Sequence, residues 1–159
     1  LRTNARGVNL NRAWREPDLT DSPEVALVRA RMLGTGVDVF LDIHGDETLP
    51  FVFADGNGMV PGFSDAHART EKRFSDTLRA VTPDFQTERG YAPDRFSDEM
   101  LTLASKWVFQ QFGCLSLTLE MPFKDNANLP DGLFGWSAAR SRRLGEATLQ
   151  ALLAALDAD

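Results

Sequence analysis

Two apolar stretches, residues 37–44 and 114–120, are the feature that most limits how this chain can fold. Each has the length of one strand, and nearly continuous apolar sequence is typical of a strand buried on both faces of a parallel sheet. Each follows a segment with helical spacing of apolar residues, and a helix leading into a parallel strand forms a right-handed crossover unit. The sequence therefore predicts an α/β fold with three layers, α/β/α, around a central mixed, largely parallel sheet.

Glycine, proline and capping residues place the remaining elements. Residues 1–159 are expected to form a single domain, large enough to bury most of its apolar surface. Helices are predicted over about 23–33, 67–80, 101–112 and 137–156, with a further short strand over 49–54 and loops over 55–66 and 86–97.

Composition limits the class of partner. With a net charge of −6, 43% apolar and 25% charged residues, the chain is typical of a soluble globular protein without a nucleic-acid surface. No apolar run approaches the roughly 18 residues of a membrane span, so we expect no membrane partner and a cytoplasmic location. Cys114 is the only cysteine, so there is no disulfide framework, and a buried structural thiol is favoured over a nucleophile. The sequence does not specify the oligomeric state.

Polar residues stand where the two predicted strands end. His44 closes the first stretch and Glu120 closes the second, and open α/β sheets hold their ligands at the carboxyl ends of strands. The pair Asn11-Arg12 adds a guanidinium fork that can grip a carboxylate through two parallel hydrogen bonds. Together these residues suggest a hydrolase that acts on a carboxylate-bearing substrate.

Each of these residues also has a structural interpretation. His44 could be a buried histidine bonded to backbone, and Glu120 could form an ion pair with a neighbouring arginine. Arg12 could form a surface salt bridge with Glu16 or Asp18. A buried, unpaired charge is expensive, so Glu120 is expected to be either paired or functional.

Three segments in this order carry a resemblance to a known family: GVNLNRAW (7–14), DIHGDE (42–47) and LTLEMPF (117–123). They resemble the zinc metallocarboxypeptidases, most closely the cytosolic-carboxypeptidase-like branch, over residues 1 to about 125 and again in the last helix. The family's upstream His-x-x-Glu, which supplies two of the three zinc ligands, does not occur here. Because the chain also begins without methionine, we expect it to be the C-terminal part of a longer enzyme, with the N-terminal portion of the fold outside it.

The resemblance implies a role for each residue at the strand ends. His44 would be a zinc ligand, with the other two ligands upstream. Asp42, two residues back on the same face, would hold its imidazole in one tautomer. Glu120 would be the general base that takes a proton from the zinc-activated water and hands one to the leaving amine. With so few ligands, the 159 residues alone are expected to be inactive.

The resemblance also implies contacts with the substrate. Asn11 and Arg12 match the pair that binds the terminal carboxylate of a peptide. Arg2 lies roughly where the family has an arginine that stabilises the oxyanion of the tetrahedral intermediate. Asn9 falls where many members carry an aspartate that orients an upstream zinc histidine.

The family's mobile tyrosine has no clear counterpart. Tyr91, the only tyrosine, stands in a glycine- and proline-containing loop, where it could swing into the site or anchor the loop. A gapless count back from Glu120 puts Ser105, Lys106 and Trp107 near the wall of the pocket for the last side chain of the substrate. Lys106 there would favour an acidic terminal residue, and a solvated helix lysine is the alternative.

Two further groups keep alternative interpretations. His67 and Glu71 lie one helical turn apart, a spacing that can bind a metal, although an exposed helix pair is favoured. Asp46 and Glu47 directly follow His44, and they either line the cleft or form a solvated turn.

The predicted function is zinc-dependent hydrolysis of the C-terminal peptide bond of a peptide or protein tail. An alternative in the same superfamily is an N-acyl amino acid deacylase of the aspartoacylase or succinylglutamate desuccinylase type, because those enzymes also use an Asn-Arg pair and a D-x-H strand end. An alternative of another class is a metal-free, degenerate carboxylate-binding module, which the missing His-x-x-Glu supports.

Overall fold

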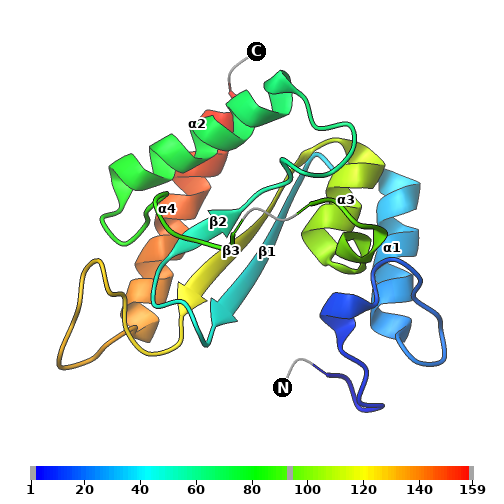
Figure 1. The fold of residues 1–159 in the computed structure, drawn as a ribbon, viewed down its shortest axis with the longest axis horizontal. Helices are drawn as coiled ribbons and strands as arrows, with labels where there is room; N and C mark the ends of the chain where they lie inside the picture. The colour runs from blue at the N-terminus through cyan, green and yellow to red at the C-terminus, as the bar shows by residue number, and fades with distance from the viewer. Residues whose placement is uncertain (1–2, 93–94, 158–159) are drawn as a thin grey trace. The chain divides into compact units, whose positions relative to one another are not determined.

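The structure is a computed structural model that describes residues 3–92 and 95–157 (Figure 1). These described residues contain four α-helices, three strands and two short 3-10 helices, joined by loops. In chain order they are η1 (Leu10–Arg12), α1 (Pro23–Thr35), β1 (Val39–Asp46), β2 (Phe53–Asp55), α2 (Asp65–Val81), η2 (Asp98–Thr102), α3 (Ala104–Phe112), β3 (Leu115–Pro122) and α4 (Ala138–Leu156).

The three strands form one sheet in the order β1-β3-β2. Strand β2 runs antiparallel to β3, with Phe53 opposite Glu120 and Asp55 opposite Thr118. A mixed sheet with four helices confirms the predicted α/β class.

One prediction about the strands is wrong for the described residues. The stretch 37–44 was expected to be an interior strand buried on both faces, but β1 has only β3 as a neighbour, and Ile43 is 52% exposed. The middle strand, β3, is buried along almost its whole length. Apolar sequence indicated that both stretches are strands, but it did not distinguish the middle strand from the end strand of this sheet.

The helix ends follow from local sequence. Helix α1 begins at Pro23, whose missing N–H costs nothing at a first helical position, and Ser137 Oγ caps α4 by accepting from the Arg140 N–H. The helix predicted over 101–112 is divided, because Leu103 is extended between η2 and α3. Gly113, with φ +61°, ends α3 in the left-handed conformation that glycine adopts easily.

Residue contacts separate the chain into two compact units. The described residues of unit 1 fall in 3–42, 57–63 and 95–117, and those of unit 2 fall in 43–56, 64–92 and 118–157. Each helix in the described part of the chain is too short or too polar to cross a membrane.

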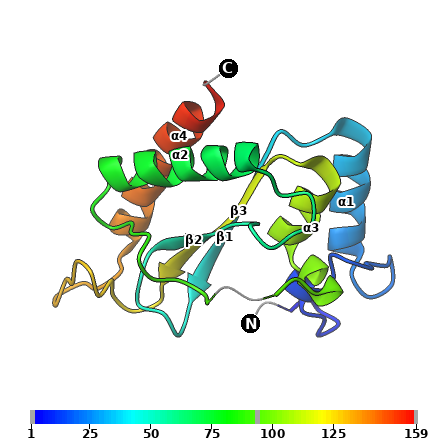
Figure 2. The ribbon, with the colours of Figure 1, turned by 45° about the horizontal axis from the view of Figure 1, so that its top comes forward.

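Unit 1 is built around two tryptophans. Trp14, just after η1, packs against Trp107 of α3 with ring centroids 5.8 Å apart. Arg29 of α1 lies over the Trp107 ring, 4.1 Å from its centroid, and donates to the Trp14 carbonyl at 2.6 Å. Helices α1 and α3 lie side by side in both views (Figures 1 and 2). This packing fixes the segment that carries the Asn-Arg pair to the body of unit 1.

Unit 2 contains a pair of packed helices, α2 and α4, which cross each other in both views (Figures 1 and 2). Phe74 and Leu78 are the buried apolar residues of α2, and Leu144, Ala147 and Ala151 are among those of α4. Both helices thus contribute buried apolar side chains to unit 2.

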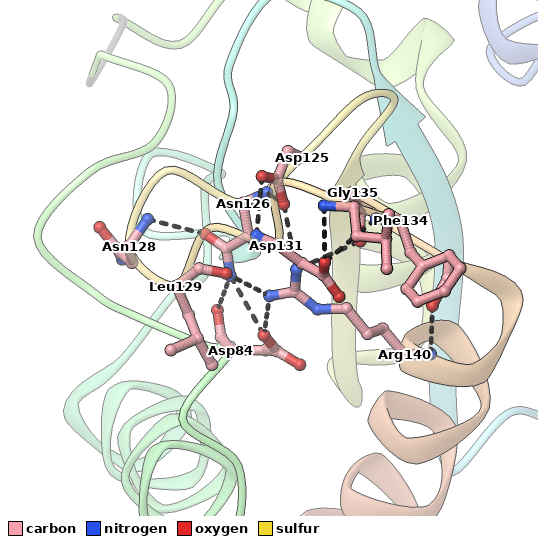
Figure 3. Close-up of polar contacts among 11 residues, drawn as sticks. Asp84, Asp125, Asn126, Asn128, Leu129, Asp131, Phe134, Gly135 and Arg140 are labelled. Atoms are coloured by element: carbon pink, nitrogen blue, oxygen red, sulfur yellow. Dashed lines mark hydrogen bonds and ion pairs between the residues drawn. The ribbon is translucent and has the colours of Figure 1, made fainter.

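A buried arginine connects α4 to the segment that follows β3 (Figure 3). Arg140 is 4% exposed and forms ion pairs with Asp84 and, at 3.1 Å, with Asp125. Its guanidinium also donates to the carbonyls of Leu129 at 2.9 Å and Gly135 at 3.4 Å. Burial lowers the pKa of Arg140, but the hydrogen bonds and negative charges of the two aspartates outweigh burial and raise it. The cation therefore remains charged and joins three parts of unit 2.

Candidate active site

His44 of β1 and Glu120 of β3 lie together in unit 2. His44 Nδ1 is 3.4 Å from Glu120 Oε1. Both residues stand two positions before the end of their strands, because β1 continues to Asp46 and β3 to Pro122. The expected proximity of the two side chains is confirmed.

Glu120 is a buried carboxylate with one unused oxygen. The residue is 4% exposed, and its Oε2 has no hydrogen-bond partner among the described residues. No arginine in the described part of the chain pairs with it, so the structural interpretation of Glu120 is not supported. Because a buried acceptor without a partner costs free energy, this oxygen points to a further group that binds there.

Tyr91 is the third side chain at this position. Its hydroxyl lies 2.6 Å from Asp46 Oδ2 and 2.9 Å from Glu120 Oε1, within hydrogen-bond distance of both. Its ring packs edge-on against Phe53, with centroids 5.0 Å apart. Tyr91 is 49% exposed, and its partial burial, followed by the hydrogen bonds to Asp46 and Glu120, raises its pKa above the ordinary value. The Tyr91 hydroxyl thus lies beside Glu120, and its part in a reaction stays a prediction.

The loop that carries Tyr91 is ordered by a buried glutamine. Gln86 Nε2 donates to the carbonyls of Val52 at 3.2 Å and Arg89 at 2.7 Å. Its Oε1 accepts from the N–H groups of Glu88 and Arg89 at 2.9 and 2.7 Å. The glutamine side chain thus satisfies four backbone groups and fixes the loop just before the tyrosine.

Asp46 is a buried residue that the sequence did not assign. It is 9% exposed, so the solvated-turn interpretation is wrong for this residue. Its Oδ1 accepts from the N–H groups of Thr48 and Leu49 at 2.5 and 2.8 Å, and its Oδ2 faces Tyr91. An aspartate followed by backbone donors two and three residues later is a common turn pattern, and this pattern and the place of Asp46 directly after His44 were the signals in the sequence.

Gly45, between His44 and Asp46, allows a close approach from the end of β3. A Cβ atom at this position would lie 2.5 Å from the nearest ring carbon of Phe123. The Phe123 N–H also donates to the Asp46 carbonyl at 3.1 Å. Glycine therefore lets the residues after His44 and those after Glu120 lie against each other.

A cavity of about 340 Å³ in unit 2 adjoins Tyr91. Phe53 and Tyr91 line one part of it, so the tyrosine that contacts Glu120 also forms a wall of this space. The rest of the wall comes from β2, α2 and the loop around Gln86, including Asp55, Ser75, Phe85, Glu88 and Arg89.

The predicted carboxylate-binding residues lie in unit 1. Asn9 Oδ1 accepts from the Asn11 N–H at 3.1 Å and caps η1. Asn11 Oδ1 accepts from the Ala104 N–H at 3.4 Å, which connects η1 to the start of α3. Arg12 is exposed and donates to the Asn11 carbonyl at 2.7 Å.

The alternative role of Arg12 as a surface ion pair is not supported. In the described residues Arg12 has no ion pair, and Glu16 lies 3.8 Å from Arg15 instead. Asp18 accepts backbone N–H groups of Thr20 and Asp21 at 2.6 and 2.7 Å. The Arg12 guanidinium is thus held by one carbonyl and exposes its remaining donors.

Residues 105–107 are buried in unit 1. Lys106 is only 6% exposed, so the solvated-lysine interpretation is wrong. Ser105 accepts from Ser116 Oγ at 2.7 Å through its carbonyl, and Trp107 belongs to the core. The role of Lys106 in terminal-residue preference stays a prediction.

The remaining predicted residues are Arg2, Asp42 and His67. Arg2 lies outside the described residues. Asp42 is half-buried in β1, two residues before His44, and its contact with the imidazole stays a prediction. His67 Nδ1 lies 3.0 Å from both the backbone nitrogen and the Oγ of Ser64, so it takes part in the cap of α2. His67 and Glu71 are both half-buried, so the expected exposed helix pair is not found.

The cluster fits one part of a metal centre. Catalytic zinc needs three protein ligands and an open position for water. Among residues 3–92 and 95–157 no group of three histidine, cysteine, aspartate or glutamate side chains could hold a metal ion. His44 could supply one such ligand, beside a buried carboxylate whose Oε2 has no hydrogen-bond partner in the described residues.

Comparisons with known proteins show what this chain is similar to. No family model matches the sequence. An uncharacterized protein of Zymomonas mobilis is 44% identical over 157 residues, which are 99% of this chain and 41% of that protein. A metallo-carboxypeptidase of Burkholderia cenocepacia is 52% identical with a TM-score of 0.97, over 100% of this chain and 42% of that one. A metallo-carboxypeptidase of Pseudomonas aeruginosa, solved in complex with (2-guanidinoethylmercapto)succinic acid, is 48% identical with a TM-score of 0.91, over 98% of this chain and 41% of that one. The chain thus spans about two fifths of the length of these relatives.

Proposed function

Because this chain belongs to the metallocarboxypeptidase family, we propose that it forms part of an enzyme that removes the last residue of a peptide or protein tail. The observation that carries the proposal is the buried Glu120 carboxylate, with one oxygen beside His44 and the other without a hydrogen-bond partner in the described residues. A carboxylate placed in this way can accept a proton from an attacking water.

Glu120 is the catalytic base in this proposal. It takes a proton from the water that attacks the scissile carbonyl and transfers a proton to the departing amine. Its burial excludes bulk water, so the carboxylate does not have to shed a full hydration shell before the transfer. Tyr91, with its hydroxyl 2.9 Å from Glu120 Oε1, is a hydrogen-bonding group at the same place.

Asn11 and Arg12 bind the terminal carboxylate of the substrate. Arg12 is exposed, has no ion pair among the described residues and keeps donors available for a carboxylate. The Asn11 side chain accepts a hydrogen bond from the Ala104 N–H, which fixes the segment that carries Arg12. The ligand named with the Pseudomonas aeruginosa relative contains two carboxyl groups, which supports a carboxylate-bearing substrate.

His44 supplies one ligand of a zinc ion, and the other ligands come from parts of the protein outside these 159 residues. When bound, zinc lowers the pKa of a coordinated water and polarises the scissile carbonyl. Asp42 orients the imidazole of His44, Asn9 orients a zinc histidine from outside these residues, and Arg2 stabilises the oxyanion. Because they lack the other zinc ligands, the 159 residues alone are inactive in this proposal. We also propose that the whole enzyme is cytoplasmic.

The proposal is tested with the full-length protein and pairs of peptides that differ only in a free or an amidated C-terminus. We expect release of the terminal residue from the free carboxylate and almost none from the amide. Arg12→Ala should lower kcat/KM by about 10- to 100-fold, because a lost carboxylate anchor also misplaces the scissile bond.

Arg31→Ala is the matched control, because Arg31 is an exposed arginine of the same unit, on α1. It should leave kcat/KM unchanged. Equal cleavage of free and amidated peptides would contradict carboxylate anchoring. Hydrolysis of small N-acyl amino acids but not peptides would favour the deacylase alternative. Binding of carboxylates without any turnover would favour the degenerate module, for which the missing three-ligand group in the described residues is the supporting observation.

A further inference from the structure

Asp46 has two different oxygen contacts, and each has a separate consequence. Oδ1 accepts two backbone N–H groups and closes the turn after β1, whereas Oδ2 is directed to the Tyr91 hydroxyl at 2.6 Å. The carboxylate is thus immobilised by the backbone on one side and available to hold a phenol on the other. A side chain fixed in this way gives its partner a defined position.

The Tyr91 hydroxyl has one proton and two carboxylates within reach. It can donate to only one of them at a time. The contact to Asp46 is the shorter, at 2.6 Å against 2.9 Å for Glu120. Because Asp46 can keep this hydrogen bond, Glu120 Oε1 can turn to another partner without releasing the tyrosine.

We propose that Asp46 is a positioning residue that anchors the Tyr91 hydroxyl beside Glu120 and keeps it there while Glu120 exchanges protons with water and substrate. This inference rests on the proposed function for the role of Glu120. The edge-on packing of Tyr91 against Phe53 fixes the ring, and Asp46 fixes the hydroxyl. Neither contact involves the substrate, so the arrangement is formed before binding.

Asp46→Asn in the full-length protein separates the two roles of this side chain. Asparagine keeps Oδ1 for the N–H groups of Thr48 and Leu49, so the turn is preserved. Its amide faces Tyr91 as a donor, which forces the phenol to donate to Glu120 instead. We expect kcat to fall by about 10- to 100-fold, with KM changed less than threefold, and we expect the fold and the unfolding midpoint to be retained.

Two further measurements distinguish positioning from a structural role. Tyr91→Phe should cause a similar loss, and the double variant should lose no more than the single variants, because both remove one unit. Ionisation of the Tyr91 phenol is measured by absorbance as the pH is raised. The signal of this one tyrosine is the wild-type curve minus the curve of Tyr91→Phe. Its midpoint should fall when Asp46 is replaced by Asn, because one of its two acceptors is gone. Asp65→Asn, an exposed carboxylate in the first turn of α2, should change neither reading.

The inference is overturned if Asp46→Asn leaves kcat and the Tyr91 titration unchanged. It is also overturned if the losses of Asp46→Asn and Tyr91→Phe multiply in the double variant. The titration needs no substrate, so it decides the Asp46–Tyr91 link even if the wild-type protein releases no terminal residues. A wild-type protein that releases no terminal residues would instead overturn the proposed function.

Discussion

Two buried carboxylate clusters in unit 2 differ in how completely their polar atoms are satisfied. In the cluster around Arg140, the guanidinium meets Asp84 and Asp125 and two backbone carbonyls (Figure 3). In the cluster around Glu120, one carboxylate oxygen contacts His44 and Tyr91, and the other has no hydrogen-bond partner in the described residues. Both Arg140 and Glu120 are 4% exposed, so burial does not distinguish them.

The difference separates a structural role from a chemical one. A buried charge whose partners are all supplied by the protein stabilises one arrangement, and removing a partner is costly. A buried carboxylate with an unused oxygen lowers the stability of the fold and is retained where a reaction needs that oxygen. We therefore expect variants of the first cluster to change stability and variants of the second to change turnover.

The largest expected effect is on turnover, in Glu120→Gln of the full-length protein. An amide cannot take the proton of the attacking water, so kcat should fall by about 10²- to 10⁴-fold. The free energy of unfolding should stay the same or rise, because an uncharged amide is easier to bury than a carboxylate. Peptide release assays and urea denaturation measure the two quantities. A strong loss of stability with normal turnover would contradict a chemical role for Glu120 and indicate a structural one.

The next effect is on stability, in Arg140→Met. The variant keeps much of the side-chain volume but leaves Asp84 and Asp125 without their cation, which should cost about 3–5 kcal/mol. Arg143→Met changes an exposed arginine one position before the buried Leu144 of the same helix and should cost less than about 0.5 kcal/mol. Urea denaturation of both variants gives the difference. Equal costs would show that the buried cluster contributes little.

The smallest expected effect is on the pH dependence of stability, through Asp131 in the segment between β3 and α4. Asp131 Oδ1 accepts from the N–H groups of Phe134 and Leu133, and these hydrogen bonds lower the pKa of its carboxyl. A carboxyl whose pKa is lowered by folding stabilises the fold at pH values above its unfolded-state pKa of about 3.9. That stabilisation is lost as the pH falls. The small advantage of wild type over Asp131→Asn in urea should therefore be present at pH 6 and shrink progressively as the pH falls below about 3.9. An advantage that grows with acid would contradict this sign.

The sequence predicted that His44 and Glu120 lie together because strand ends are encoded locally. His44 and Glu120 each close an apolar stretch, and two such strands in one sheet bring their ends together. The final helix and its cap at Ser137 were predicted for a similar reason, since capping chemistry is local.

The contacts that local sequence does not encode were missed. Asp46 and Tyr91 are 45 residues apart, and only the folded loop around Gln86 brings the hydroxyl to the carboxylate. Lys106 was interpreted as a solvated lysine or a pocket residue, because its burial depends on packing in unit 1. The position of β1 at the end of the sheet was missed because apolar content does not specify how many neighbouring strands there are.

The most direct test of the account is the zinc content of the full-length protein and two variants, measured by mass spectrometry after dialysis against a weak chelator. Wild type and Glu120→Gln should each retain about one zinc ion per chain, because our proposal assigns Glu120 to the water and not to the metal. His44→Ala should lose most of its zinc, since our proposal makes His44 one of the three protein ligands. Full zinc retention in His44→Ala, or loss of zinc in Glu120→Gln, would contradict the assignment of these two residues.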